Sequence, residues 1–269
     1  MIVFPNGKIN LGLSVLNKRE DGFHNIESIL YPAPIYDVLE FQPSKLFSIE
    51  VSGLKIPGEI NENILFSTWN FLHQTHQVPP IEIKILKNIP LGSGLGGGSS
   101  DAAFLLKTLN NYYNLKLTSY DLKIYAASIG SDCPFFIENK ASIIRGHGEI
   151  VEYIDLSLKD LHIIIVMPDV QISTREAFQY IEKGNQKVNL KDIVTKPIEQ
   201  WQDQLLNDFE RVTFKKHPVL KKIKDSLLGE GAVYSSLTGS GGAVFGIFKQ
   251  PVNMKKYFPD YRVWDGVLK

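Results

Sequence analysis

The sequence has little of several features that would place it in a specialised class of proteins. It contains one cysteine, Cys133, which excludes an internal disulfide and a cysteine-rich zinc site and fits a reducing compartment. Its 29 basic and 29 acidic residues cancel, whereas proteins that neutralise a nucleic-acid backbone carry a basic excess. The densest later apolar run, residues 163–167, is far shorter than the ~20 residues of a membrane helix, and no signal-like segment opens the chain. We expect a cytoplasmic protein with neither a nucleic-acid nor a membrane partner.

The chain also lacks internal repeats and low-complexity linkers. Its 269 residues, 43% of them hydrophobic, suffice for one large domain or two modest ones with a sizeable core. A polar interval at residues 155–160 precedes a new apolar segment. We therefore expect an N-terminal domain over residues 1–155 and a C-terminal domain over residues 156–269.

Hydrophobic periodicity predicts both strands and helices along the chain. Alternating or continuous apolar residues predict strands at 8–15, 47–51, 81–85, 162–167, 232–237 and 243–248. Apolar residues at helical spacing predict helices at 63–74, 101–113, 119–129 and 219–228, and another after Thr174. Thr118 is the expected N-cap of the helix at 119–129, and Gly130 is its expected stop.

A glycine-rich loop is the most distinctive feature of the sequence. The segment reads Pro90-Leu-Gly-Ser-Gly-Leu-Gly-Gly-Gly-Ser-Ser-Asp101 and holds five of the chain's 21 glycines. Such density indicates a backbone that takes positive φ or approaches another group closely. The loop follows a predicted strand and opens a predicted helix, so its free amides and the helix dipole would converge on an anion. We interpret the segment as a phosphate-binding loop in preference to a flexible linker.

Two named phosphate motifs compete for this loop. The P-loop pattern is not met, because no lysine follows the glycines at the required position. The dinucleotide pattern G-x-G-x-x-G is met by Gly92, Gly94 and Gly97, but the preceding strand alternates, and Asp121 falls in a helix where the dinucleotide pattern has an acidic residue at a strand end. A different type of phosphate loop is therefore favoured.

Three further segments carry residues that could join a site. Lys8 lies at the start of the first strand, where an isolated lysine would by default be solvent-exposed. Asp132 lies on an expected turn, and Pro134 is expected to hold the preceding backbone extended. Residues 237–243 form a second glycine and serine loop between two apolar strands, which in isolation could be a hairpin turn. Each segment has an ordinary structural explanation alone, and only their combination suggests a site.

The combination resembles the GHMP kinase superfamily, small-molecule kinases with an N-terminal strand motif, a glycine-rich phosphate loop and a C-terminal glycine loop. The motifs that carry the likeness are Asn6-Gly-Lys-Ile-Asn-Leu11, Asp21-Gly-Phe-His24, Pro90 to Ala103, Gly130-Ser-Asp-Cys-Pro-Phe135 and Leu237-Thr-Gly-Ser-Gly241. They span nearly the whole chain. Gly7 and Phe23 replace the usual alanine and tyrosine, and neither departure removes a charged group.

The resemblance implies an α+β, two-lobed fold with a left-handed βαβ element in the N-terminal domain. Within the superfamily the motifs are most similar to those of kinases acting on a cytidine diphosphate-linked methylerythritol. The implied activity is transfer of phosphate from ATP, with Mg²⁺, to the 2-hydroxyl of that small molecule, in the non-mevalonate route to isoprenoid precursors. We expect a monomer or a weak homodimer.

The resemblance also implies a role for each motif. Lys8 and Asp132 would form the catalytic pair, which suits phosphoryl transfer because the reaction needs charge neutralisation and a proton acceptor at the hydroxyl. ATP would lie on Pro90, Leu91, Gly92, Ser93, Gly94, Leu95, Gly96, Gly97, Gly98, Ser99 and Ser100, with Ser100 also contacting the metal. The substrate would be bound by Asn10, Phe23, His24, Phe178, Gly239 and Gly241. Here His24 would hydrogen-bond the edge of the cytosine. Phe23 would stack on one face of the cytosine ring, and Phe178 would form the opposite wall.

Three other functions compete with this interpretation. An oxidoreductase could bind a dinucleotide on the same loop, and melting shifts with ATP and Mg²⁺ against NAD or NADP would distinguish the two. A nucleotide-binding module without catalysis would be favoured if Lys8 and Asp132 were distant from the loop. A kinase of homoserine or mevalonate would have no need for the motif at residues 21–24.

Overall fold

The computed structural model describes residues 1–20, 22–170, 172, 174–179, 181 and 189–269, which divide into two compact units. Unit 1 comprises residues 1–7, 35–91 and 96–139, and unit 2 comprises residues 8–34, 92–95 and 140–269. The units therefore exchange segments along the chain, and both contribute to the glycine loop. The predicted domain boundary at residue 155 stays a prediction.

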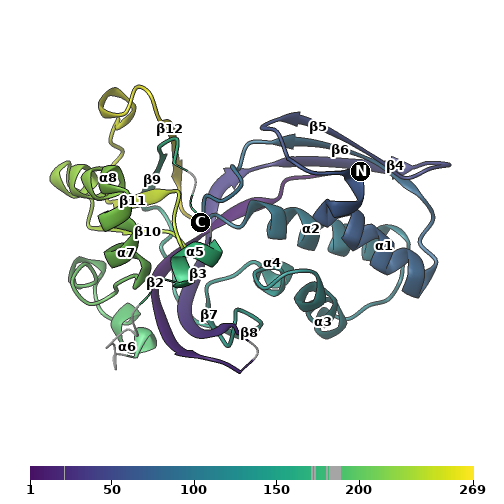
Figure 1. The fold of residues 1–269 in the computed structure, drawn as a ribbon, viewed down its shortest axis with the longest axis horizontal. Coiled ribbons are helices and arrows are strands. Elements are labelled where there is room, and N and C mark those ends of the chain that lie inside the picture. Colours follow the sequence, from purple (N-terminus) through teal and green to yellow (C-terminus); the bar gives the residue numbers. More distant parts are fainter. Residues whose placement is uncertain (21, 171, 173, 180, 182–188) are drawn as a thin grey trace. The chain divides into compact units, whose positions relative to one another are not determined.

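Unit 1 is built on a four-stranded sheet with the order β1-β4-β6-β5. Its strands are β1 (Ile2–Val3), β4 (Val38–Pro43), β5 (Ser48–Gly53) and β6 (Ile81–Lys87). Its helices are α1 (Ile64–His76), α2 (Gly97–Tyr112), α3 (Ser119–Ile129), α4 (Cys133–Glu138) and the 3-10 helix η1 (Ile60–Glu62). Figure 1 shows α1 and α2 on one face of the sheet.

One pair of strands in this sheet is parallel. β5 runs parallel to β6 and is connected to it through α1, whereas β1 with β4 and β4 with β6 are antiparallel. A parallel pair requires such a crossover. β5, α1 and β6 thus form the β–α–β element of the fold, whose left hand stays a prediction.

Unit 2 contains two four-stranded sheets, with the orders β2-β3-β7-β8 and β10-β11-β9-β12. Most of β2 (Asn6–Lys18) and β3 (His24–Tyr36) belongs to it, together with β7 (Ser142–Arg145), β8 (Ile150–Tyr153), β9 (His162–Met167), β10 (Tyr234–Leu237), β11 (Val244–Phe248) and β12 (Arg262–Val267). Its helices are α5 (Thr174–Gln179), α6 (Leu190–Val194), α7 (Phe209–Lys216) and α8 (Pro218–Gly229), with the 3-10 helices η2 (Ile198–Gln200) and η3 (Lys255–Tyr257).

The core of unit 2 lies between its helices and the sheet that contains β9. Leu220, Ile223 and Leu227 recur at helical spacing on α8 and are fully buried. They belong to one hydrophobic cluster with Val166 of β9 and Val244 of β11. The apolar side chains of the helix and those of the strands therefore pack together in one core.

Most predicted elements are confirmed, and the fold class is α+β. The helix predicted at 119–129 has those bounds, and Thr118 accepts from the amide of Asp121 as its cap. Two expectations were wrong. α2 begins at Gly97, four residues before the predicted start, because Gly96 adopts a left-handed conformation and caps the helix. Residues 133–138 form α4 in place of an extended turn, because Pro134 occupies its first turn, where no amide donor is needed.

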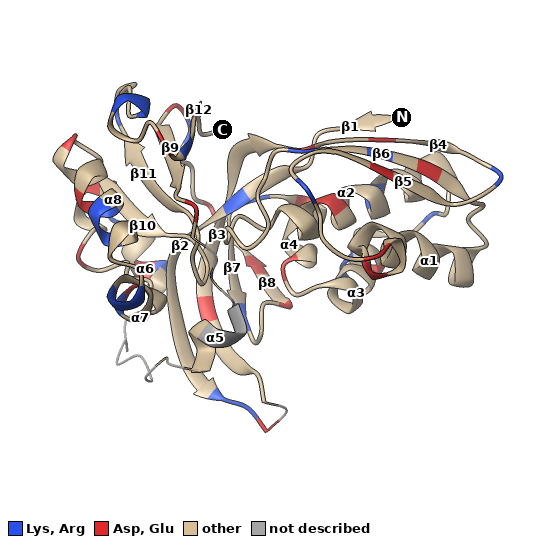
Figure 2. Ribbon diagram, turned by 45° about the horizontal axis from the view of Figure 1, so that its top comes forward, with Lys and Arg blue, Asp and Glu red and all other residues tan. Residues whose placement is uncertain are grey.

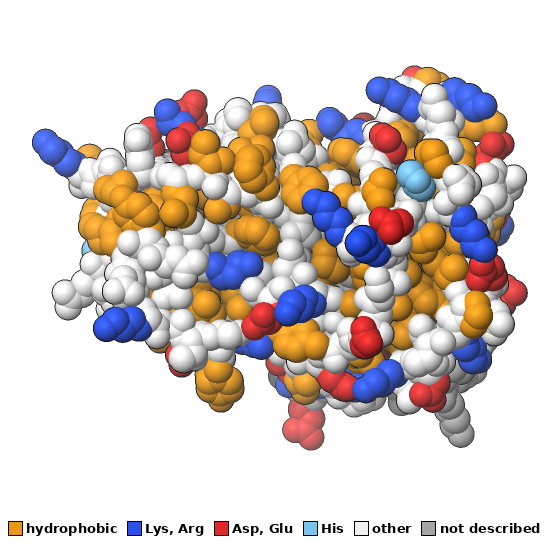
Figure 3. Space-filling view, turned by 180° about the vertical axis from the view of Figure 1, so that it is seen from behind, with side chains coloured by type: hydrophobic (Ala, Val, Ile, Leu, Met, Phe, Trp, Pro, Cys, Tyr) orange, Lys and Arg blue, Asp and Glu red, His pale blue; other side chains and the backbone are white. Residues whose placement is uncertain are grey.

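Charged side chains of both signs are interspersed on the described part of the chain. Figure 2 shows acidic segments on β4 and β5 next to basic segments on β6. In this region Lys84 lies 3.8 Å from both Glu50 and Glu82. The face in Figure 3 likewise mixes hydrophobic, basic and acidic side chains. Among the described residues, no helix has the length and hydrophobicity needed to cross a membrane.

Candidate active site

The first half of the glycine loop packs against the second glycine loop within unit 2. The carbonyl of Ser93 accepts a hydrogen bond from the amide of Ala243 (3.0 Å), and the carbonyl of Gly94 accepts one from the hydroxyl of Thr238 (3.1 Å). Gly94 has a φ of +77°, and a Cβ added to it would lie 2.8 Å from the carbonyl carbon of Thr238. A residue with a side chain cannot approach so closely. The structure thus brings together the two glycine loops that the sequence indicated.

The second loop is a hairpin loop between the antiparallel strands β10 and β11, and it also packs against the first loop. Gly239, Gly241 and Gly242 have φ values of +57°, +121° and +105°. A Cβ on Gly242 would lie 2.8 Å from the Cα of Ser93. The loop is therefore a packing partner of the phosphate loop, and it contains Gly239 and Gly241, the two glycines predicted to contact the substrate.

Lys8 and Asn10 lie at this junction of the two loops. The amide of Lys8 donates to the carbonyl of Leu95 (2.8 Å), and its ammonium group donates to Asn10 Oδ1 (2.6 Å). The same oxygen of Asn10 accepts from the amide of Gly239 (2.9 Å). Lys8 is 3% exposed, so the default of a solvent-exposed lysine is wrong. Asn10 links the lysine to the second glycine loop.

The second half of the glycine loop belongs to unit 1 and forms the N-terminus of α2. Gly96 has a φ of +72° and is the N-cap of this 16-residue helix. The amides of the first helical turn have no partner within a helix, and the helix dipole adds a partial positive charge there. The hydroxyl of Ser100 is buried and has no hydrogen-bond partner among the described residues. The amides at the start of a helix and the buried hydroxyl of Ser100 suit a phosphate group and its metal ion.

Asp132 lies close in sequence to a contact with this helix. It precedes α4 as the N-cap residue, with φ of −86° and ψ of −12°. The neighbouring thiol of Cys133 is hydrogen-bonded to Ser99 of the loop, and burial raises the pKa of that thiol to about 12. A Cβ on Gly130 would lie 3.1 Å from the Cys133 sulfur and 3.7 Å from the Ser99 hydroxyl. Within unit 1 the turn that carries Asp132 therefore packs against Ser99 of the loop.

Lys107 of α2 holds the other end of α4. Its ammonium group donates to the carbonyls of Phe136 (2.8 Å) and Ile137 (3.2 Å), at the C-terminus of the helix. Cations are favoured at this end of a helix dipole. Burial lowers the pKa of Lys107 to about 8. The helix that begins after Asp132 is thus anchored to the helix that follows the glycine loop.

Lys8 belongs to unit 2 and Asp132 to unit 1. Each lies beside its own half of the glycine loop: the Lys8 amide contacts Leu95, and the residue after Asp132 contacts Ser99. Their direct pairing as a catalytic couple stays a prediction.

The residues predicted at the cytidine end lie together in unit 2. The imidazole of His24 stacks on the ring of Phe178, with centroids 5.0 Å apart and planes inclined by 16°. Phe23 is 60% exposed and its ring lies 5.7 Å from that of His147. Burial, assisted by the charge of Lys18, lowers the pKa of His24. The role of these residues toward a substrate stays a prediction.

Sequence reasoning missed a buried charged cluster beside the loop, formed by Asp37, Lys87 and Asp101. The signal was present in β6, where Ile81, Ile83 and Ile85 alternate inward and Lys87 continues the same period. An alternation that ends on a lysine places that lysine on the buried side.

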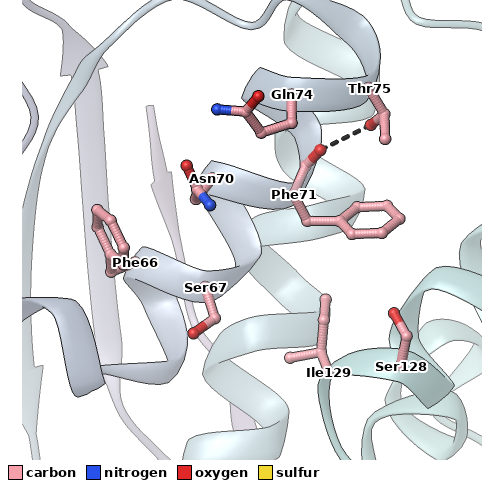
Figure 4. Close-up of a pocket in the computed structure, with 8 residues that line it drawn as sticks. All are labelled: Phe66, Ser67, Asn70, Phe71, Gln74, Thr75, Ser128 and Ile129. Carbon is pink, nitrogen blue, oxygen red and sulfur yellow. Dashed lines mark hydrogen bonds between the residues drawn. The ribbon is translucent and has the colours of Figure 1, made fainter.

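A pocket of about 440 Å³ lies elsewhere in unit 1, between α1 and the end of α3. Figure 4 shows carboxamides of Asn70 and Gln74 and the ring of Phe71 on the α1 side, opposite Ser128 and Ile129. Phe66, Ser67 and Thr75 complete its lining. None of the residues predicted for the site lines this pocket.

The comparisons with known proteins agree with this geometry. The GHMP kinases N terminal domain matches residues 63–140, and the GHMP kinases C terminal domain matches residues 190–256. A protein of Parabacteroides distasonis named 4-diphosphocytidyl-2-C-methyl-D-erythritol kinase is 44% identical over 100% of both chains. A protein of Bacteroides thetaiotaomicron with the same name is 46% identical over 93% of this chain and 92% of its own.

A solved structure extends the likeness to three dimensions. The crystal structure of a 4-(cytidine 5'-diphospho)-2C-methyl-D-erythritol kinase has a TM-score of 0.85 and 26% identity, and the match covers 100% of this chain and 99% of that one. Similarity in sequence and in structure thus spans the whole chain, including both glycine loops. The chain belongs to the GHMP kinase family, in its group of 4-diphosphocytidyl-2-C-methyl-D-erythritol kinases.

Proposed function

We propose that this chain transfers the γ-phosphoryl group of ATP to the 2-hydroxyl of 4-diphosphocytidyl-2-C-methyl-D-erythritol. The product is the 2-phosphate, an intermediate in the non-mevalonate synthesis of isoprenoid precursors. The observation that carries the proposal is the junction in unit 2, where Lys8 and Asn10 join the two glycine loops. The names of the full-length relatives supply the substrate.

The glycine loop is the proposed seat of the ATP phosphates. Gly96 and the first turn of α2 present amide donors and the positive end of the helix dipole. Gly92 and Gly94, with φ of +65° and +77°, give the first half of the loop a backbone conformation that residues with side chains rarely adopt. Backbone donors fixed in this way stabilise charge without reorganising during the reaction.

Mg²⁺ fits the donor set beside the loop. The Ser100 hydroxyl is buried and free of partners among the described residues, and hard oxygen ligands are those that Mg²⁺ prefers. In the described ranges, no group of three or more His, Cys, Asp and Glu residues could hold a metal ion, so phosphate and water oxygens would complete the shell. The bound ion would neutralise charge on the transferred group.

Lys8 and Asp132 are the proposed catalytic residues. The ammonium group of Lys8 can neutralise charge that develops on the phosphoryl group, and its hydrogen bond to Asn10 sets its direction. The carboxylate of Asp132 can orient the substrate hydroxyl and accept its proton. Both groups act on the same reaction coordinate, because proton removal strengthens the nucleophile as charge builds on the transferred group.

The cytidine end of the substrate is assigned to His24, Phe23 and Phe178. The lowered pKa of His24 keeps its imidazole neutral at pH 7, so one ring nitrogen accepts a hydrogen bond while the other donates. A cytosine edge offers the matching acceptor and donor. Phe23 is exposed, and its aromatic ring suits stacking on a pyrimidine ring.

Two of the competing functions are disfavoured by particular observations. β6, the strand before the loop, pairs antiparallel with β4, which differs from the parallel sheet of a dinucleotide-binding oxidoreductase. The amide of Lys8 contacts the loop directly, which favours a catalytic site over a plain nucleotide-binding module. The oligomeric state, a monomer or a weak homodimer, stays a prediction.

A coupled assay of ATP consumption tests the proposal. With Mg²⁺ present, we expect turnover with the cytidyl substrate and none with homoserine or mevalonate. Thermal melting should rise with ATP and Mg²⁺ and stay unchanged with NAD or NADP. Turnover confined to homoserine or mevalonate, or no ATP consumption at saturating cytidyl substrate, would overturn the assignment.

A further inference from the structure

Three charged side chains are buried together in unit 1, beside the glycine loop. The ammonium group of Lys87 lies 2.5 Å from Asp37 Oδ2 and 2.6 Å from Asp101 Oδ2. The side chains of Lys87, Asp37 and Asp101 are 1%, 0% and 3% exposed. We call these three residues the buried cluster. Charged side chains are almost never buried so completely unless they are paired, so the cluster needs an explanation.

The buried cluster connects the two ends of the loop. Lys87 is the last residue of β6, and Asp101 is the fifth residue of α2, the helix that the loop opens. The second oxygen of Asp37 accepts hydrogen bonds from the amides of Asn88 (2.6 Å) and Ile89 (2.9 Å). One carboxylate therefore fixes the backbone just before the loop, and one ammonium group ties that carboxylate to the helix just after it.

The helix packs directly onto this connection. A Cβ on Gly97, the first residue of α2, would lie 2.7 Å from the Cγ2 of Ile89 and 3.3 Å from the ammonium nitrogen of Lys87. The first residue of α2 therefore packs against Ile89, just after β6, and against Lys87 of the cluster. Because Lys87 is enclosed by protein, it has no exposed face on which to bind a nucleotide.

Stability alone is a poor explanation for the buried cluster. Buried ion pairs are seldom more stable than apolar residues of the same size, because desolvation offsets the attraction. Two carboxylates around one ammonium group are less favourable still, because like charges repel each other in a buried site. Asp101 Oδ1 has no partner among the described residues. The free-energy cost of burying these charges is explained if the cluster fixes the position of α2 relative to β6, which apolar contacts alone would fix less sharply.

We propose that the buried cluster is a positioning element, which sets the distance and angle between the two ends of the glycine loop and so presents its amides to the phosphates of ATP. This inference rests on the proposed function, because it assigns Lys87 and Asp101 to the binding of ATP. Hydrogen bonds have fixed lengths and directions, so a bridge through three side chains specifies the loop ends more sharply than apolar packing does.

Three single variants test the proposal. Asp101→Ala removes the tie to α2 but leaves Lys87 paired with Asp37, so no charge is stranded. Asp101→Asn keeps an oxygen that accepts from Lys87, so this variant should bind ATP as the parent does. Asn110→Ala is the matched control, because Asn110 is also buried on α2 but bonds Leu117 at the far end of the helix. If Asp101→Ala does not fold, Asp101→Ser replaces it, since the shorter hydroxyl cannot span to Lys87.

The readouts are the Kd of ATP with Mg²⁺ by calorimetry, the KM of both substrates and the melting temperature. For Asp101→Ala we expect the Kd and KM of ATP to rise on the order of tenfold to a hundredfold, as for a displaced positioning group. The KM of the cytidyl substrate should stay unchanged. Asp101→Asn should have a Kd of ATP near the parent value. Asn110→Ala should lower the melting temperature without changing that Kd.

Two results would overturn the proposal. One is an unchanged Kd of ATP in Asp101→Ala or its serine substitute. The other is a rise in the Kd of ATP in Asn110→Ala that equals the rise in Asp101→Ala when both variants lose the same melting temperature. That result would show that destabilisation in general weakens ATP binding. A parent protein that binds ATP but transfers no phosphoryl group to the cytidyl substrate would instead refute the proposed function and leave this test intact.

Discussion

Gly94→Ala tests the junction of the two glycine loops, and Gly92→Ala is its matched control. Both residues have left-handed φ values, +77° for Gly94 and +65° for Gly92, so alanine is strained at either position by about 1–2 kcal/mol. Their surroundings differ. A Cβ on Gly94 would lie 2.8 Å from the carbonyl carbon of Thr238 and closer still to its oxygen, whereas a Cβ on Gly92 would meet nothing nearer than 3.8 Å among the residues that the structure describes. The pair therefore separates backbone strain from steric overlap.

The steric overlap adds to the cost at Gly94 alone. Overpacking a well-packed site costs about 1–3 kcal/mol, so Gly94→Ala should lose about 2–5 kcal/mol in total and Gly92→Ala only the strain. A difference of about 2 kcal/mol corresponds to roughly 4–8 °C in Tm for a chain of this size. Relief of the overlap would push the loop off Thr238, so the Kd of ATP should rise with the loss of stability.

Thermal unfolding and ATP calorimetry on both variants check this prediction. We expect the melting temperature of Gly94→Ala to fall well below that of Gly92→Ala, and its ATP affinity to fall further. Equal melting temperatures for the two variants would refute the reasoning, because they would show that the Thr238 contact contributes nothing to the fold.

The remaining predictions concern catalysis, substrate binding and pH. Asp132→Asn and Lys8→Met should each slow single-turnover phosphoryl transfer by on the order of a hundred to ten thousand-fold at unchanged ATP affinity, and retention of more than about a tenth of the parent rate would show that the pair is wrongly assigned. His24→Ala should raise the KM of the cytidyl substrate more than it lowers kcat, since it removes binding that is distant from the reacting atoms; steady-state kinetics with an unaltered KM would contradict the substrate assignment. Lys107 has a folded-state pKa of about 8, below its ordinary 10.5, so the unfolded chain binds more protons there and the free energy of unfolding should rise with pH between those values. Urea unfolding at pH 7 to 10 should show this rise in the parent and its loss in Lys107→Met; parallel profiles would contradict it.

Local signals in the sequence predicted the helices and strands that are built from local chemistry. α3 is the plainest example, because the cap at Thr118 and the stop at Gly130 both act within a few residues of its ends. The start of α2 was placed too late, since Gly97 and Gly98 disfavour a helix by propensity, yet both lie in its first turn, after the N-cap at Gly96. α4 was missed because a proline after Cys133 suggests an extended backbone, whereas a proline in the first turn of a helix does not.

The parts of the candidate site that lie in a sequence motif could be predicted. The parts that depend on contacts between distant segments of the folded chain could not. The two glycine loops could be recognised from composition, and the structure confirms that they pack together through Thr238 and Gly94. The link between Lys8 and Asn10 was not predictable, because alternation in β2 predicts one buried face, whereas residues 6–15 are buried on both faces. Residues 37, 87 and 101 are far apart in sequence, and no local pattern joins them. Only the folded chain shows that they surround one ammonium group.

The chain's single thiol gives this site an internal probe of local opening. Cys133 is 0% exposed, and a thiol with a pKa of about 12 has almost no thiolate at pH 7, so the folded protein should react with alkylating reagents only during transient openings. Those openings must separate α4 from Ser99, beside Asp132 and the phosphate loop. The rate at which the unmodified protein is alkylated at Cys133 therefore reports how often this part of the site opens. Bound ATP should slow that rate in proportion to the fraction of protein that has ATP bound.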